Sequence, residues 1–232
     1  LLDAAAVYIL LRSRYVSHMV FCSIHDSSSA ADFDWAPLQA PAGFVFEQES
    51  SLSGFREEIK PFVEGKNDAV EISFAAADYI NFLCCNGRSG KPLVWADPGG
   101  ILRQAKQGAS GIHCFHRSIL LSAFLSSLGI RSRIWALEGA GFDGNAHTVN
   151  EIYSERMGKW ILVDCMNNCY AREGDTFLSC LELRRKILSG NAGDVSFFDF
   201  SRRRISEAFG LTERYGELMP CVLLRCRNDF IE

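Results

Sequence analysis

The segment 112–165 constrains the fold of this chain most, because three hydrophobic patterns follow one another there in close succession. Apolar residues recur at helical spacing from Ile112 to Leu128, and Gly129 stands where a glycine C-cap is expected. The next residues, IRSRIWAL, are typical of a strand. After a loop, AHTVNEIY and KWILVDC predict two strands joined by the turn SERMG. The sequence therefore predicts an α+β fold in which a helix packs on an antiparallel sheet.

The patterns outside this segment are weaker. Residues 71–85 have a helical apolar pattern, and we also expect helices near 178–188 and 202–209 and a strand near 221–226. The stretch SSSAADFDWAPLQAP is rich in Ser, Ala, Asp and Pro, which is typical of a linker.

We expect three parts along the chain, packed as one compact unit. Residues 1–65 form an N-terminal extension with a helix, a strand, the linker and a second helix. Residues 66–170 form the core, which carries the candidate site. Residues 171–232 form a C-terminal extension that packs on this core.

The composition describes an ordinary globular protein and excludes some functions. The 232 residues are 48% hydrophobic and 22% charged, which is sufficient for one good-sized core. The net charge of −4 gives no basic surface, so no nucleic-acid partner is expected. The apolar opening LLDAAAVYILLRSRY is too short to span a bilayer and lacks the features of a signal peptide.

The cysteines favour a reducing compartment. Their number, nine, is odd, and their spacings form no repeated framework of the kind that secreted disulfide-rich domains have. We therefore expect a cytoplasmic protein.

One of these cysteines, Cys114, lies at a chemically distinctive place. The break GASG before it and the amphipathic pattern after it place Cys114 in the first turn of the predicted helix. Unsatisfied backbone N–H groups and the helix dipole favour a thiolate there, and the same N–H groups can stabilise an oxyanion.

The predicted hairpin supplies a base and a carboxylate. If Tyr153 pairs with Gly158 across the turn, His147 lies directly opposite Asp164. An imidazole beside a carboxylate has a defined tautomer and a stabilised protonated form. Cys114, His147 and Asp164 are therefore predicted to form a nucleophile–base–acid triad for thiolate acyl transfer.

The residues of this triad carry a resemblance to the transglutaminase-like superfamily over about 112–168. GIHCFHRSILLSAFLSSLGIRSRIWAL resembles the cysteine helix and following strand of that family, and AHTVNEIYSERMGKWILVDC resembles its hairpin. The resemblance implies a papain-like core of the stand-alone bacterial type, with Cys114 as nucleophile, His147 as base and Asp164 as third member. Glu151 and Trp160 match hairpin positions of structural importance, and on the register above they face each other.

The resemblance also implies the chemistry. An amide or ester donor (a peptide, a protein or a small molecule) acylates the cysteine, and an amine or water releases the thioester. No cofactor and no metal are expected. Trp95 and Gln107 precede the nucleophile and are expected on the oxyanion side, where related enzymes use an upstream Trp or Gln. One departure is Cys165, which stands where the family often has a proline.

Three alternatives remain open on the sequence alone. The chain could be a catalytically inactive binding module of the same fold. It could be an acyl-CoA transferase similar to arylamine N-acetyltransferases, although their Gly- and Arg-containing cysteine motif is not found. A zinc site is the third alternative, on a spacing that matches no standard structural pattern; its ligands would be His113, His116, Cys165 and Cys169.

Overall fold

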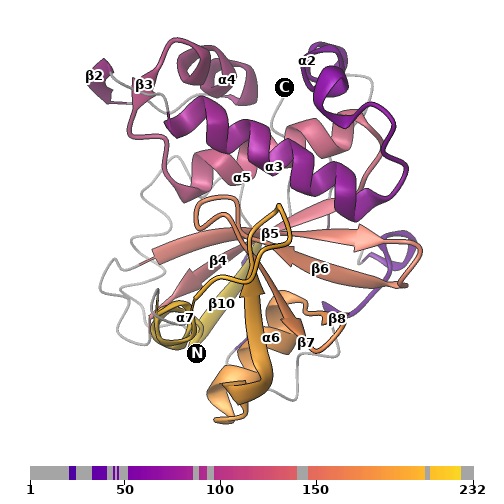
Figure 1. Cartoon of the computed structure of the whole chain (residues 1–232), viewed down its shortest axis with the longest axis vertical. Coiled ribbons are helices and arrows are strands. Elements are labelled where there is room, and N and C mark those ends of the chain that lie inside the picture. Colours follow the sequence, from indigo (N-terminus) through magenta and orange to yellow (C-terminus); the bar gives the residue numbers. More distant parts are fainter. Residues whose placement is uncertain are drawn as a thin grey trace.

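The computed structural model describes residues 21–24, 33–40, 44, 46, 52–85, 89–92, 97–139, 146–206 and 210–225. An antiparallel sheet forms the middle layer, with helices on both sides (Figure 1). Its strands are β1 (Phe21–Ile24), β4 (Ser132–Glu138), β5 (Ala146–Ser154), β6 (Lys159–Val163) and β10 (Cys221–Arg225). The α+β prediction, with the cysteine-bearing helix packed on an antiparallel sheet, is confirmed.

The helices and smaller sheets lie on either side of this layer. Four helices cover one face (Figure 1): α2 (Ser53–Val63), α3 (Ala69–Cys85), α4 (Pro98–Lys106) and α5 (Cys114–Ser127). The other side holds α6 (Cys180–Leu188), α7 (Leu211–Leu218) and a sheet of β7 (Tyr170–Glu173), β8 (Thr176–Phe177) and β9 (Val195–Phe198). A short parallel pair, β2 (Ser89–Pro92) and β3 (Ala109–Ser110), lies near α4, and 3-10 turns cover Pro37–Gln39 and Ala192–Asp194. In the described part of the chain, no helix has the length and apolarity needed to cross a membrane.

The strand order of the main sheet is β1-β10-β4-β5-β6, so strands from both ends of the chain enter it. Strand β10 pairs with β4 on one side and with β1 on the other. The three-part division of the chain stays a prediction, but 1–65, 66–170 and 171–232 each contribute a strand to one sheet.

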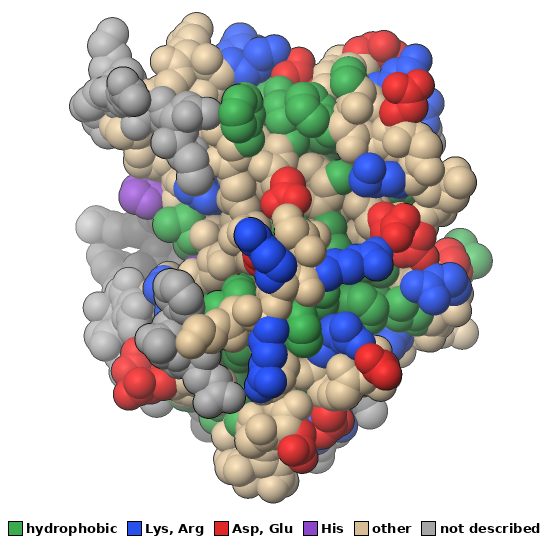
Figure 2. Space-filling view, viewed as in Figure 1, with side chains coloured by type: hydrophobic (Ala, Val, Ile, Leu, Met, Phe, Trp, Pro, Cys, Tyr) green, Lys and Arg blue, Asp and Glu red, His purple; other side chains and the backbone are tan. Residues whose placement is uncertain are grey.

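Alternation along the strands divides the interior into two cores. On the helix-covered face, Ile134 and Ile152 pack with Ile119 and Phe124 of α5. On the opposite face, Trp135, Val149 and Leu162 pack with residues of α6 and α7. The main sheet is therefore buried on both faces, and lysines, arginines and acidic residues are interleaved over the outer surface seen in Figure 2.

Helix α5 begins and ends close to the predicted positions. It starts at Cys114 and ends at Ser127. Gly129 follows with a φ of +76°, and the N–H of Ile130 donates to the Leu125 carbonyl at 2.9 Å. This left-handed residue satisfies carbonyls at the end of the helix, so the predicted glycine cap is confirmed. The predicted helix over 71–85 is confirmed as well, as α3.

The hairpin register differs from the prediction by two residues. Tyr153 pairs with Trp160 rather than Gly158, and Glu151 pairs with Leu162 rather than Trp160. Gly158 instead belongs to the turn, with a φ of +64° and its N–H donating to the Ser154 carbonyl at 2.8 Å. Because strand side chains alternate with period two, a shift of two leaves every side chain on its predicted face.

The C-terminal part is predicted less accurately. The helix predicted near 178–188 is confirmed as α6 and the strand predicted near 221–226 as β10, but the helix near 202–209 is wrong for its described residues. Arg202 has a φ of +66°, outside the right-handed helical region, and the helix forms instead at α7, after Gly210 with a φ of +61°. Strands β7 and β9 have no counterpart in the prediction.

A buried ion pair lies in the centre of the sheet. The Arg133 Nε donates to the Glu151 Oε2 at 2.6 Å, and the two side chains are 1% and 0% exposed. The Glu151 Oε1 accepts the backbone N–H of Cys180 at 2.6 Å, which ties α6 to β5. The guanidinium also lies 4.1 Å from the ring centroid of Trp160, which donates its indole N–H to the backbone of Trp35. Glu151 and Trp160 thus share one buried polar centre without facing each other.

We expect Glu151→Gln to lower the free energy of unfolding by about 3–5 kcal/mol, because it leaves the Arg133 guanidinium buried without a counter-charge. Urea denaturation measures this change. The control is Glu71→Gln, which breaks an exposed ion pair with Arg202 and should cost less than about 1 kcal/mol. Equal small losses for both variants would show that the buried pair does not stabilise the fold.

Candidate active site

The Cys114 thiol lies at the N-terminus of α5 and contacts the beginning of β5. The residue before it, His113, is the N-cap, with extended backbone. Burial alone would raise the pKa of the Cys114 thiol, but a hydrogen bond with His147 and hydrogen bonds from the backbone and hydroxyl of Thr148 lower it below its ordinary value. The geometry therefore favours a thiolate at this position.

The contact predicted between His147 and Asp164 is confirmed. The His147 Nε2 lies 2.6 Å from the Asp164 Oδ2, and the two side chains are 2% and 0% exposed. Since Nε2 is engaged by the carboxylate, Nδ1 is the ring nitrogen left to face Cys114. Burial would lower the pKa of His147, but Asp164 and, to a lesser degree, the neighbouring thiolate raise it to about 10.

The Asp164 carboxylate accepts hydrogen bonds from three side chains and one backbone group. Besides His147, the Asn167 Nδ2 donates to Oδ2 at 2.8 Å, and the Tyr215 hydroxyl donates to the same oxygen. The other oxygen, Oδ1, accepts the backbone N–H of Asn167 at 2.9 Å. Burial would raise the pKa of Asp164, but His147 and these donors lower it, so the carboxylate stays ionised.

Asn167 and Tyr215 are site residues that the sequence analysis missed. Asn167 lies three residues after Asp164, a spacing at which an acidic side chain commonly accepts a backbone N–H in a turn, so a local signal existed. Tyr215 follows 51 residues later on a separate helix, and no local pattern connects it with Asp164.

The turn that carries Asn167 is held by the two helices above it. Its last residue, Asn168, has a φ of +53° and accepts a hydrogen bond from the Asn81 Nδ2 of α3 at 3.1 Å. Asn81 in turn accepts from the Arg117 Nη1 at 2.8 Å. Arg117 lies one turn after Cys114 on α5, so this chain of hydrogen bonds connects the cysteine helix with the turn beside Asp164.

The expectation that Trp95 and Gln107 lie on the oxyanion side stays a prediction. Gln107 is exposed at the C-cap of α4, and within the described residues no hydrogen bond joins it to Cys114 or His147. Trp95 lies outside the described residues. The donors next to the Cys114 thiol are instead the backbone N–H and the hydroxyl of Thr148.

The two histidines that flank Cys114, His113 and His116, are joined to each other by a hydrogen bond. The His116 Nδ1 accepts the backbone N–H of His113 at 3.3 Å. Burial and the charge of His113 lower the pKa of His116 to about 4, so its imidazole is neutral at physiological pH. Among the described residues, no three His, Cys, Asp or Glu side chains are grouped to hold an ion.

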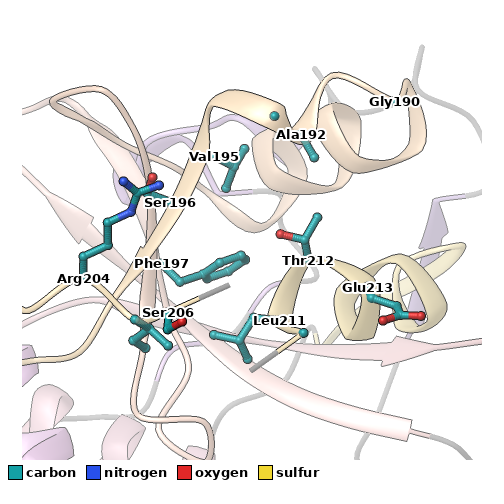
Figure 3. A pocket seen from close by; sticks show the side chains of 13 residues that line it. Gly190, Ala192, Val195, Ser196, Phe197, Arg204, Ser206, Leu211, Thr212 and Glu213 are labelled. Atoms are coloured by element: carbon teal, nitrogen blue, oxygen red, sulfur yellow. The ribbon is translucent and has the colours of Figure 1, made fainter. Parts of the chain in front are cut away.

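Two cavities lie away from the three residues of the site. One, of about 390 Å³, is formed by β9, the residues after it and the first turn of α7, with Phe197, Leu211 and Thr212 in its wall (Figure 3). The other, of about 820 Å³, lies between the start of α3 and the turn of the hairpin. Neither is lined by Cys114, His147 or Asp164.

Comparisons with known proteins find only distant similarity. No protein-family model and no curated protein matches the chain. Among solved structures, a candidate cysteine protease from Cytophaga hutchinsonii is similar, with 13% identity and a TM-score of 0.42 over 77% of this chain and 58% of that one. A candidate protease from Parabacteroides distasonis matches with 14% identity and a TM-score of 0.35 over 72% of this chain and 28% of that one. This chain therefore spans less than two thirds of either protein, and at these values the similarity indicates neither substrate nor reaction.

We expect Cys114 to react with iodoacetamide at pH 6 well ahead of the other cysteines. Its thiolate is favoured by His147, whereas burial raises the pKa of the Cys165, Cys169 and Cys180 thiols well above the ordinary value. Site-resolved mass spectrometry over a pH series measures the rates. An alkylation midpoint near the ordinary value of about 8.5 would show that Cys114 is a passive core residue.

The same alkylation measurement on variants tests the contributions of His147 and Asp164. His147→Ala should slow alkylation at pH 6 by at least about tenfold, because the thiolate loses its counter-charge. Asp164→Asn should fall between that variant and the wild type, since it disturbs the orientation and charge of the imidazole without removing it. Rates that are indifferent to both substitutions would contradict the triad.

Proposed function

We propose that this protein is a thiol-dependent acyl-transfer enzyme in which Cys114 is the nucleophile, His147 the acid and base, and Asp164 the residue that orients and charges the imidazole. The observation that carries this proposal is the position of His147: its imidazole is buried between the thiol of Cys114 and the ionised carboxylate of Asp164. A purely structural histidine does not need a carboxylate on one nitrogen and a helix-terminal thiol on the other.

In the first step, the Cys114 thiolate attacks the carbonyl carbon of an amide or ester donor. The carbonyl π electrons move to oxygen, and the oxyanion that forms is stabilised by N–H groups at the start of α5. The tetrahedral intermediate then collapses as the bond to the leaving nitrogen or oxygen breaks. The imidazolium of His147 donates its Nδ1 proton to that atom, and an acyl thioester remains on the cysteine.

In the second step, an acceptor attacks the thioester. Neutral His147 takes a proton from water or from an amine, the nucleophile adds to the carbonyl carbon, and the thiolate leaves. Water gives hydrolysis and an amine gives transamidation. Asp164 keeps its negative charge in both steps and stabilises the imidazolium each time it forms.

The resemblance of residues 112–168 to the transglutaminase-like superfamily supports this assignment, because the three triad residues fall on the matching positions of its motifs. On the same basis the donor class is a peptide, a protein or a small-molecule amide or ester. His116 is neutral at physiological pH, so it adds no second imidazolium beside the thiolate.

We expect Cys114→Ala to abolish acyl transfer while the free energy of unfolding changes by only about 1 kcal/mol, since one small side-chain atom is removed at a half-buried position. The wild-type protein, mixed with a panel of activated esters and peptide amides and quenched in acid, should carry an acyl group on the Cys114 peptide that hydroxylamine removes. Thermal unfolding measures the stability of the variant.

The matched control is Cys180→Ala, which deletes the same atom from a fully buried position away from the site. It should retain the acyl adduct. An adduct that persists in Cys114→Ala, or that never forms on the wild type with any donor, would overturn the proposal and favour a non-catalytic module. Release of free CoA from acetyl-CoA would instead favour the acyl-CoA transferase alternative.

A further inference from the structure

The residue that contacts the site from farthest along the chain is Tyr215. Its side chain is fully buried, and its hydroxyl donates to the Asp164 Oδ2. The same oxygen accepts from His147 at 2.6 Å and from the Asn167 Nδ2 at 2.8 Å. Three donors therefore share one carboxylate oxygen, whereas Oδ1 accepts from the Asn167 backbone.

The position of the Tyr215 ring is fixed by packing and by its own helix. The ring lies parallel to Phe197 of β9, with 5.4 Å between the ring centroids and 5° between the planes. Phe197 also forms part of the cavity wall in Figure 3. At the end of α7, the Arg184 side chain of α6 donates to the carbonyls of Met219 and Pro220 at 2.8 and 2.9 Å. A helix held at its end and a stacked ring give the hydroxyl a defined position.

The backbone of Asp164 is held next to the same tyrosine. Asp164 and Cys169 form a bridge of two backbone hydrogen bonds, at 2.8 and 3.0 Å. The Cys169 Sγ lies 3.8 Å from the Tyr215 hydroxyl oxygen. The side chain of Asp164 is thus held by Tyr215 of α7, and its backbone is held by Cys169, which itself lies next to Tyr215.

We propose that Tyr215 is a positioning residue for the acyl-transfer site: its hydroxyl holds the Asp164 carboxylate in place and sets how strongly that carboxylate attracts the proton of His147. This inference rests on the proposed function, since it assigns a role within the same triad. A neutral donor on an anionic oxygen stabilises the anion and lowers its proton affinity. With Tyr215 present, Asp164 stays ionised and shares its charge between the phenol and the imidazole.

The phenol acts as a donor over the whole working range of pH. Burial and the adjacent Asp164 raise the pKa of Tyr215 well above its ordinary value, so the hydroxyl keeps its proton. The other titratable or charged groups around this carboxylate are His147, Cys114, Cys165 and Cys169, with Arg214 acting on Cys169. Of these groups, His147 is the partner in direct hydrogen-bond contact with the Asp164 side chain.

Removal of the Tyr215 hydroxyl should shift the titrations of Cys114 and His147 in a defined direction. In Tyr215→Phe the Asp164 carboxylate loses a donor, so its negative charge acts more strongly on its neighbours, and the protons of His147 and Cys114 are held more tightly. The Cys114 thiolate should therefore take up its proton at a higher pH, and the imidazolium of His147 should persist to a higher pH. A residue that only fills space would change the stability and leave both titrations where they are.

The experiment compares the pH dependence of Cys114 alkylation in the wild type, in Tyr215→Phe and in the matched control Tyr79→Phe. Tyr79 also donates its hydroxyl to a carboxylate, that of Glu58, in a different part of the protein. We expect the acid midpoint of Cys114 alkylation to move up by about half a pH unit or more in Tyr215→Phe, and to stay in place in Tyr79→Phe. An unmoved or downward-shifted midpoint in Tyr215→Phe would overturn the proposal.

A measurement on the wild type covers the case in which Tyr215→Phe does not fold. With tyrosines labelled with ¹³C at Cζ, the Tyr215 resonance should change with the same acid midpoint as Cys114 alkylation, because protonation of the thiolate changes the charge of the hydrogen-bonded group to which its acceptor Asp164 belongs. A Tyr215 resonance that is flat through this midpoint would contradict the inference. If wild-type Cys114 itself titrates like an ordinary thiol, the proposed function fails; if it does not and only Tyr215 is silent, the function stands and this inference alone fails.

Discussion

The candidate site depends on the hydrogen bonds that stabilise the ionised carboxylate of Asp164. A fully buried carboxylate is unfavourable unless donors replace the water that it has lost. Here the donors come from three places: His147 on β5, Asn167 in the turn after β6, and Tyr215 on α7. Because each donor belongs to a different element, the charge of Asp164 also defines how the hairpin, the turn and the C-terminal helix are arranged around the cysteine helix.

The protein contains a second buried carboxylate with a different consequence. Glu151 lies on the same strand as His147 and is paired with Arg133, which is charged at every physiological pH. Its partner cannot give up a proton, so this pair stabilises the sheet and ties α6 to it through the Cys180 N–H. Asp164 is paired instead with the imidazole of His147, which can give up a proton. The two buried carboxylates therefore differ in whether their partner can titrate.

Local sequence patterns were sufficient for the elements that carry Cys114, His147 and Asp164. The periodicity after Ile112 and the position of Gly129 predicted α5, and the turn between the two strands after 146 predicted the hairpin. The register was wrong by two residues, because the prediction placed Gly158 in the ladder when its left-handed φ places it in the turn. The His147–Asp164 contact survives this error because alternation has a period of two.

What the sequence by itself determined is therefore local: a cysteine at a helix start, a histidine and an aspartate on one face of a hairpin, and an α+β fold. The tertiary structure alone decided which distant groups complete the site. Tyr215 follows Asp164 by 51 residues, Asn81 precedes Asn168 by 87, and the strand β10 enters the sheet beside β4. The physical reason is that short-range patterns report the face and the cap of each element, whereas hydrogen bonds between elements depend on how the two cores pack, and no spacing within one segment encodes that.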